Sequence, residues 1–424
     1  MNNKIAVEAP RRITTERSAH SHWLPNAVTR LIFGRPLAPD NDEWQAIIAA
    51  TQTGDAEMDR VVNWMFEESP GQRKKLFEQA LTQGIGSLEE PPEPLLRFFS
   101  VIDQDPPWLD RELMEQGIAA SHLAGNTSFY VLRDMALMGG YAYFNSANQT
   151  LAAAGSLTSK TSLRLGETGK WLMDVTEPGG MSRFGNGFIT TIRVRMVHAL
   201  VRRNLLQNRQ WDTSTWGVPI NQADMTATYL AFGPVTISGV RMFGVPVDLK
   251  QSKAAMHMWR YIGWLSGVEE RWLALSERDG WRKLYHTFLT HGLPDEKIAQ
   301  LGRALRQEPL QRYLPGLARY PRLTRLKQKY LYHLHLSNSA AILGPLQRKQ
   351  LGLPLWILPW YPLVSAPWRF TYLMCLKLRG GKPLARYAKK CREQQRALLD
   401  AYFAEKPKQI IDPDKDHPAH VAME

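Results

Sequence analysis

Cysteine is nearly absent from this chain of 424 residues, which contains only Cys375 and Cys391. Two thiols cannot form the disulfide framework of a secreted protein, so we expect a reducing compartment. The N-terminus has no apolar run, so we expect no secretory signal peptide. Arg11-Arg12 is not followed by an apolar segment either, which argues against a twin-arginine signal. These features favour a cytoplasmic protein.

A long, uninterrupted apolar helix is also missing. The uncharged stretch 350–368 is close to the length of a membrane span, but prolines at 354, 359, 362 and 367 would break a continuous helix. Two interpretations stay open. The segment packs irregularly over the core, or it forms a shallow patch at a membrane surface. In the second case its tryptophans and the basic residues beside it would meet anionic lipid, and the protein would be peripheral to the membrane.

Acidic residues are outnumbered, with 40 Asp and Glu against 53 Lys and Arg, and the net charge is +13. Part of the excess comes from a run between Arg303 and Lys329 whose only acid is Glu308. A basic surface favours acidic partners. The sequence has no zinc-finger spacing and no nucleic-acid-binding motif. We therefore interpret the run as a solvated basic face and expect no nucleic-acid partner.

Motifs for nucleotide binding and zinc proteolysis are absent: there is no G-x-G-x-x-G, no P-loop and no H-E-x-x-H. Apolar residues instead recur with helical spacing in five stretches, 43–50, 59–66, 73–81, 255–275 and 327–343. This pattern predicts an all-α fold, divided into an N-terminal helical cap (1–92), a helical core (93–290) and a basic C-terminal helical part with a solvated tail (291–424). Asn41 or Asp42 is expected to cap the first helix. Residues 232–247, rich in glycine and β-branched side chains, predict a connector or a short hairpin.

One histidine lies between two arginines on the helix predicted from Phe188 onward. Arg195, His198 and Arg202 are spaced i−3, i and i+4, so they share a helix face. An imidazole on this mostly apolar face could bind the iron of haem while the arginines hold the two propionates. The alternative is a buried helix whose histidine bonds to a carbonyl and whose arginines pair with carboxylates.

A second polar stripe precedes it. Arg164, Glu167, Thr168 and Trp171 are spaced i, i+3, i+4 and i+7 on another predicted helix. The turn at 178–180 would fold the two helices into an antiparallel hairpin and set the stripe opposite His198. The stripe is either a solvated edge or the roof of a pocket whose floor carries His198.

Several segments occur in a characteristic order: PPWLD (106–110), MGGYAYFNSANQTLAAAGSL (138–157), RLGETGKWLMDV (164–175), RVRMVHALVRR (193–203), GVPINQADMTAT (217–228) and MWRYIGWLSGV (258–268). With them the chain resembles the latex clearing protein (rubber oxygenase) family. That family also includes the fungal oxygenase that cleaves the farnesyl chain in mycophenolic acid synthesis.

The resemblance implies a globin-like helical core that binds haem b (heme b), with His198 as the iron ligand. Cofactor contacts are expected from Arg195, Arg202 and Trp171, and Thr228 is expected to be structural. Arg164 and Thr168 match positions near bound oxygen. The implied reaction inserts both atoms of molecular oxygen across an isoprenoid double bond and gives an aldehyde and a ketone.

The sequence departs from the rubber-cleaving pattern in two ways. Glu167 stands where those enzymes have a lysine, and no Asp or Glu occurs between Asp134 and Glu167 to match their glutamate base. Asn145 and Asn148 are the polar residues available there, and an amide cannot accept an allylic proton as a carboxylate does. We therefore expect Glu167 to act as the base and the substrate to be a small isoprenoid or other apolar molecule. A non-catalytic haem sensor or carrier and a haem-free lipid-binding protein stay open as alternatives. The sequence does not specify the oligomeric state.

Overall fold

The structure is a computed structural model that describes residues 8–13, 30–31, 34–153, 161–207, 211–292 and 295–403. Within these ranges every regular element is a helix and no strand occurs. The all-α fold predicted from the sequence is confirmed.

The N-terminal elements are α3 (Asn41–Thr51), α4 (Ala56–Glu67), α5 (Pro70–Gln83), η2 (Ile85–Ser87), α6 (Glu93–Ile102), α7 (Arg111–His122), α8 (Asn126–Val131), the π-helical turn η3 (Leu132–Leu137), α9 (Met138–Tyr143) and α10 (Asn145–Ala153). The middle elements are α11 (Thr161–Val175), α12 (Asn186–Gln207), α13 (Thr213–Trp216), α14 (Gln222–Leu230), the π-helical turn η4 (Ala231–Val235), α15 (Thr236–Met242), α16 (Leu249–Leu265), η5 (Glu270–Trp272) and α17 (Glu277–Phe288). The C-terminal elements are α18 (Glu296–Gln311), η6 (Pro315–Leu317), α19 (Pro321–Ala340), α20 (Pro345–Gln350), α21 (Trp360–Leu378) and α22 (Gly381–Phe403).

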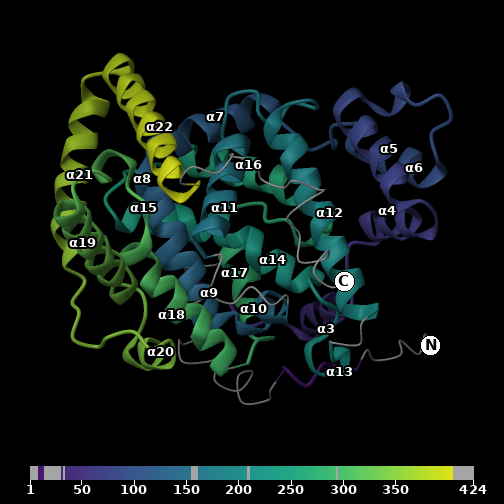
Figure 1. The fold of residues 1–424 in the computed structure, drawn as a ribbon, viewed down its shortest axis with the longest axis horizontal. Coiled ribbons are helices and arrows are strands. Elements are labelled where there is room, and N and C mark those ends of the chain that lie inside the picture. The colour runs from purple at the N-terminus through teal and green to yellow at the C-terminus, as the bar shows by residue number, and fades with distance from the viewer. Residues whose placement is uncertain are drawn as a thin grey trace.

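The central helices, among them α11, α12, α14 and α16, are flanked on both sides (Figure 1). Helices α4, α5 and α6 lie on one side, and α19, α21 and α22 lie on the other (Figure 1). One buried apolar cluster includes Met58 of α4 and Tyr402 of α22, so it joins residues from all three parts that the sequence predicted. The division at residues 92 and 290 stays a prediction.

The expected helices are present as α3, α4, α5, α16 and α19, although α16 ends at Leu265 and not at Leu275. The cap of α3 is Asp40, so the expectation of Asn41 or Asp42 was wrong. The Asp40 carboxylate accepts a 2.8 Å bond from the Glu43 N–H, and the Glu43 carboxylate accepts from the Asp40 N–H at 3.1 Å. This reciprocal pair satisfies two N–H groups that the helix leaves unbonded.

The prediction for residues 232–247 was also wrong, because this segment contains part of η4 and all of α15. Val235, Ile237 and Val240 are buried there. Burial of these β-branched side chains against neighbouring helices outweighs their modest preference for strands.

Helices α11 and α12 form the expected hairpin, and glycines make it tight. A Cβ on Gly187 would lie 2.7 Å from the Asp174 carbonyl oxygen, and one on Gly180 would lie 2.2 Å from the same oxygen. Only residues without a side chain fit these positions, so the glycines fix how closely the two helices approach.

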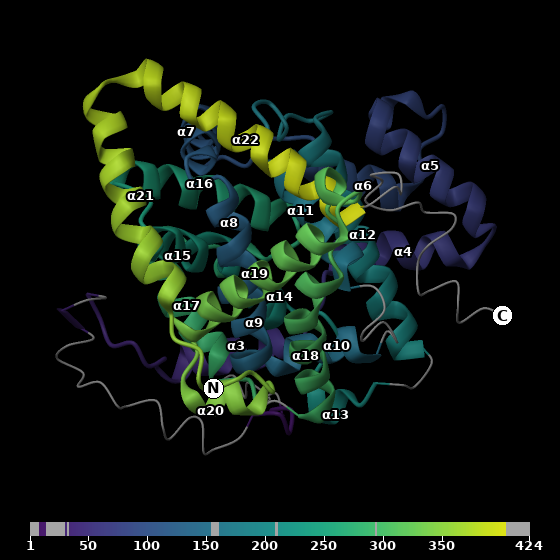
Figure 2. The ribbon, with the colours of Figure 1, turned by 60° about the vertical axis from the view of Figure 1, so that its left-hand side comes forward.

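The uncharged segment 350–368 is divided between an irregular stretch and the start of α21. Pro362 falls in the first turn of α21, where its missing N–H costs no helical bond. Pro367 lies inside the helix, contrary to the expectation that it would break one. No helix of the described ranges is long and apolar enough to span a membrane. Figure 2 shows α21 running along the edge of the molecule, with α22 returning across it.

Candidate functional site

His198 lies in the middle of α12 and is half-buried, as are Val194 and Val201 one turn away in either direction. The three side chains lie on one strip of the helix, as the spacing predicted. Groups of three or more His, Cys, Asp and Glu that could hold a metal ion do not occur among the described residues. A haem iron takes only one or two ligands from the protein, so a single histidine suffices.

Both arginines that flank His198 are ion-paired. Arg195 donates from Nε and Nη2 to the Asp55 carboxylate at 2.6 and 2.9 Å, and from Nη1 to the Leu265 carbonyl at 3.3 Å. Arg202 donates from Nε and Nη2 to Asp59 at 2.9 and 2.7 Å. Burial raises the pKa of Asp59, and the charge of Arg202 opposes that rise. This pairing is the alternative that the sequence left open, and the contact of both arginines with propionates stays a prediction.

The register of the hairpin relates the polar stripe to His198. Trp171 Nε1 donates a 3.0 Å bond to Thr191 Oγ1, and the Val175 Cα would lie 2.8 Å from a Cβ on Gly187. Both pairs belong to one antiparallel register. Two turns further along, this register reaches Arg164 on α11 and His198 on α12.

Arg164 is half-buried, and its charge acts on the Tyr141 hydroxyl of α9. Burial raises the pKa of Tyr141, and the guanidinium counteracts that effect. The guanidinium of Arg164 is therefore a cation on α11 at the position that faces His198 in the register of the hairpin.

Glu167 is half-buried, whereas Thr168 is the single exposed residue of α11. Helix α14 shows the same pattern, since Thr228 is its one exposed residue. The Thr228 hydroxyl donates to the Asp224 carbonyl at 2.8 Å, which accords with the structural role expected for it. Thr228 is thus the one exposed position of a buried helix, whereas Thr168 lies on a helix with several half-buried residues.

Trp171 belongs to an aromatic cluster that the sequence did not reveal. Its ring centroid lies 5.1 Å from that of Phe232 and 6.0 Å from that of Trp259. Phe232 and Trp259 are stacked, with centroids 5.2 Å apart. Phe232 was missed because its segment was predicted to be a connector.

A narrow, mostly apolar cavity begins at this cluster. Phe232 and Trp259 line it together with residues of α7, α8, α11, α15 and α22, and its volume is about 60 Å³. One water needs about 10–15 Å³ by this measure, so only a few waters fit. A larger ligand would have to displace side chains. The aromatic cluster connects the cavity to α12. Trp171 contacts Phe232 and Trp259, which line the cavity, and it donates a hydrogen bond to Thr191 of α12.

The cavity has a polar end. His122 shares a 2.6 Å hydrogen bond with the Thr176 carbonyl, and burial lowers the pKa of this imidazole. Arg392 donates to Thr176 Oγ1 at 3.1 Å and to the Met173 carbonyl at 3.0 Å. The cavity therefore combines an apolar body with a satisfied polar rim.

The Asn148 amide, upstream of α11, bonds to the backbone of its own segment. Asn148 Nδ2 donates to the Phe144 carbonyl at 2.9 Å and to the Gly140 carbonyl at 3.2 Å, and Asn145 is buried. Because residues 135–166 contain no Asp or Glu, Glu167 is the first carboxylate after Asp134.

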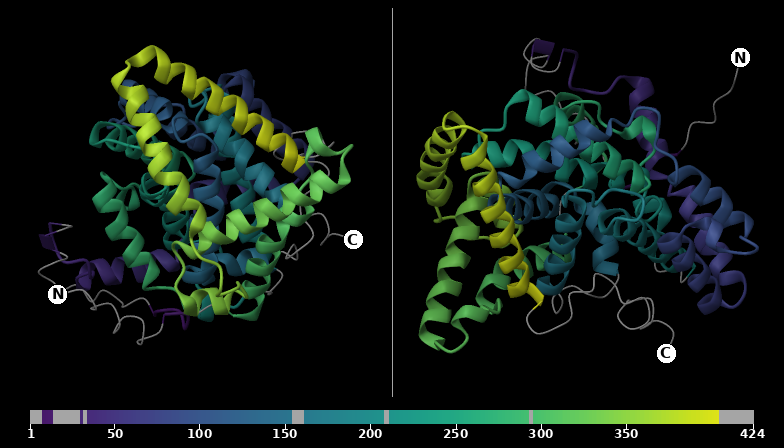
Figure 3. Two further views of the ribbon diagram at one scale, coloured as in Figure 1. Left: turned by 90° about the vertical axis from the view of Figure 1, so that its left-hand side faces the viewer. Right: turned by 90° about the horizontal axis from the view of Figure 1, so that it is seen from above.

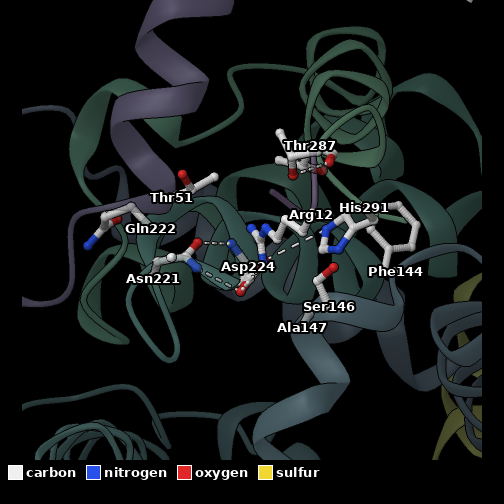
Figure 4. Close-up of polar contacts among 12 residues, drawn as sticks. Arg12, Thr51, Phe144, Ser146, Ala147, Asn221, Gln222, Asp224, Thr287 and His291 are labelled. Carbon is white, nitrogen blue, oxygen red and sulfur yellow. Dashed lines mark hydrogen bonds and ion pairs between the residues drawn. The ribbon is translucent and has the colours of Figure 1, made fainter. Parts of the chain in front are cut away.

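The GVPINQADMTAT segment supplies a separate buried polar cluster (Figure 4). Arg12 donates to both Asp224 oxygens at 3.1 and 2.9 Å, and His291 Nε2 lies 3.7 Å from the same carboxylate. The Asn221 amide caps α14 and donates to Asp224 at 2.8 Å. These contacts hold the chain around residue 12 against α14, so the polar residues of this segment have structural roles.

A family model described as "ER-bound oxygenase mpaB/B'/Rubber oxygenase, catalytic domain" matches residues 128–374, more than half of the chain. The chain belongs to this family. The matched range contains both helices of the hairpin, the aromatic cluster and most of the cavity wall.

Two relatives agree with this assignment. The chain is 25% identical over 201 residues to a rubber oxygenase of Streptomyces sp. (strain K30), covering 46% of this chain and 47% of that protein. The chain thus matches about half the length of this curated relative. The solved structure of latex clearing protein LCP in the closed state has a TM-score of 0.61 and 18% identity, covering 84% of this chain and 93% of that one. That likeness shows the fold.

Proposed function

We propose that this chain is a haem b-dependent oxygenase that acts with molecular oxygen on the double bond of an isoprenoid or other apolar substrate. The observation that carries the proposal is the family match over residues 128–374, which includes His198 and most of the wall of the apolar cavity. Because the match to the curated relative covers half of that protein, the activity is a proposal for this chain.

The surroundings of His198 suit an iron ligand of haem. The His198 imidazole is half-buried on an apolar strip, next to a helix whose Thr168 is open to solvent. When bound, the haem would supply the redox-active iron that dioxygen chemistry requires. Arg195 and Arg202 hold α12 against Asp55 and Asp59 and so fix the helix that carries His198.

The other residues would act on the substrate and its protons. The cavity would bind an apolar chain and exclude water, and Phe232 and Trp259 would form its wall toward the hairpin. Glu167 would accept an allylic proton at a carboxylate oxygen, in place of an upstream carboxylate. Arg164 would stabilise negative charge near the reacting group.

An absorption spectrum from about 350 to 650 nm, before and after reduction by dithionite, tests haem binding to the purified protein. We expect a strong Soret band and split bands on reduction. His198→Ala should abolish these bands and leave the far-UV circular dichroism unchanged. His333→Ala, at an exposed position of α19, is the matched control and should keep them. Full haem retention by His198→Ala would contradict the assignment, and so would a featureless wild-type spectrum after haem is added.

A haem-binding protein without oxygenase activity is the second candidate. It is favoured by the absence of Asp and Glu between Asp134 and Glu167 and by Glu167 itself, which stands where the rubber-cleaving enzymes have lysine. Oxygen uptake with a farnesyl-bearing compound separates the two. An oxygenase should consume oxygen and form aldehyde and ketone, and Glu167→Gln should slow this reaction without loss of haem. Bound haem without uptake would favour the sensor or carrier.

A further inference from the structure

Helix α21 presents an apolar face to solvent along most of its length. Most of its exposed residues recur with helical spacing, at Trp360, Leu363, Val364, Pro367, Trp368, Thr371, Cys375 and Leu378, and Phe370 and Tyr372 are exposed as well. Trp368 is 76% exposed and Val364 is 72% exposed. A surface helix normally turns such a stripe toward the core. Within the described part of the chain this stripe stays open to solvent, apart from Trp360, whose ring contacts those of Tyr330 and Tyr361.

The apolar face continues onto neighbouring segments. Trp356, 74% exposed, contacts His333 of α19 with centroids 6.2 Å apart, and Tyr330 contacts Trp360 at 6.3 Å. The first turns of α19 add further exposed apolar side chains, namely Tyr320, Leu323 and Leu326. We call this set of residues on α21, on the stretch before it and on α19 the aromatic face. Helix α21 lies on the side of the molecule that is turned toward the viewer in the left view of Figure 3.

The segment that forms the aromatic face carries charge of one sign, although Asp248, which caps α16, pairs with Lys377 of α21 at 3.4 Å. Residues 309–392 contain 16 Lys and Arg and no Asp or Glu. Arg322, Arg325 and Lys329 are exposed on α19 beside its apolar residues, and Arg379 is exposed at the end of α21. Tryptophan and tyrosine favour the interface between water and lipid headgroups, and cations nearby favour anionic lipids.

We propose that the aromatic face docks on the surface of an anionic lipid bilayer. Apolar side chains would enter the headgroup region, and the cations around them would bind lipid phosphates. The excess of positive charge in this segment argues against pairing with a second copy of this chain, because the same cations would meet across a two-fold interface. A bilayer rich in anionic lipid complements both the aromatic residues and the charge.

The inner side of α21 relates this surface to the cavity. Leu373 and Leu376 pack in one apolar cluster with Ala124 and Val240, and both of these also line the cavity. Helix α21 therefore lies between the aromatic face and the cavity wall. If the proposed function holds, docking would bring the cavity close to lipid, from which an isoprenoid substrate could be taken up.

The two cysteines allow the docking to be measured on the full chain. Cys375 is exposed on the α21 stripe, whereas Cys391 is buried, so a thiol-reactive, polarity-sensitive fluorophore would label Cys375. We would add vesicles of phosphatidylcholine alone or mixed with phosphatidylglycerol. We expect a blue shift and co-sedimentation with the mixed vesicles, weakened by salt because the attraction is partly electrostatic.

Two double variants identify the surface, and the first has a matched control. Val364→Gln with Trp368→Gln should weaken binding at least tenfold, whereas Leu249→Gln with Leu275→Gln, exposed on other elements, should not. Arg322→Gln with Arg325→Gln should weaken it by about fivefold per charge removed.

Vesicle binding does not depend on haem or turnover, so its failure is distinct from failure of the proposed oxygenase. The proposal is overturned by a folded protein that ignores anionic vesicles, or by binding that the α21 variant leaves unchanged. It is also overturned by a dimer that forms without lipid and that the α21 variant dissociates. Equal binding to neutral vesicles would refute the role of the cations.

Discussion

At the scale of single residues, Arg195 pairs with Asp55 and Arg202 pairs with Asp59. These ion pairs explain why arginines flank His198 without invoking a cofactor. Side chains of the first pair are only 9% and 4% exposed. Removing one partner of a buried ion pair leaves an uncompensated charge and costs about 3–5 kcal/mol. We expect Asp55→Ala to lower the free energy of unfolding by about that amount, measured by urea denaturation.

If the protein binds haem as proposed, the rate of haem dissociation distinguishes the two roles of Arg195. If it only positions α12, Asp55→Ala and Arg195→Met should destabilise the protein alike, and the folded fraction should release haem at the wild-type rate. If it binds a propionate, Arg195→Met alone should release haem faster. Arg193→Met, on the same helix, is the control and should have little effect, because Arg193 pairs with Glu78 at a partly exposed site.

At the scale of elements, the hairpin of α11 and α12 depends on Gly187. An added Cβ there would lie 2.7 Å from the Asp174 carbonyl oxygen and 2.8 Å from the Val175 Cα, both of them backbone atoms that cannot rotate away. Gly187→Ala should therefore push the helices apart and lower the thermal midpoint, and it should weaken the proposed haem binding. Gly140→Ala, in α9 with open space around its Cβ, should be neutral or stabilise by up to about 1 kcal/mol. Equal midpoints for both variants would contradict the role of Gly187.

Elements with a strong helical period were predictable from the sequence, since the spacing of their apolar residues reports which face is buried. The face shared by Arg195, His198 and Arg202 followed from residue spacing alone, once a helix was predicted from Phe188 onward. The partners of those arginines were not predictable, because Asp55 and Asp59 lie more than 130 residues earlier in the chain. The helical form of 232–247 was missed because tertiary burial outweighed local preference. The stacking of Phe232 on Trp259 was missed with it.

At the scale of the whole molecule, a buried charge network joins η3, α18 and α19. Arg133 pairs with Asp134 at 2.6 Å, Arg312 pairs with Glu308 at 2.7 Å, and His335 Nδ1 lies 2.7 Å from Asp134. Two cations balance two anions, so a neutral imidazole completes the network. Burial, reinforced by the charge of Arg133, lowers the pKa of His335 to about 4, and the pKa of Glu308 is lowered to about 2, because Arg312 outweighs the effect of burial.

This network should make the protein sensitive to acid. Below pH 6.5, the usual pKa of histidine, the unfolded chain protonates His335 while the folded protein does not. Stability therefore falls with pH between 6.5 and about 4, by roughly 3 kcal/mol from this residue at about 1.4 kcal/mol per pKa unit. Glu308 adds a further loss of stability as pH falls from 4.5 toward 2.

His335→Gln should flatten the pH dependence of the urea midpoint between pH 6.5 and 4. His333→Gln, exposed on the same helix, should retain it. If the urea midpoint of His335→Gln depends on pH as steeply as that of the wild type, the acid sensitivity comes from other buried histidines. His286 is one of these, and burial lowers its pKa to about 4 as well.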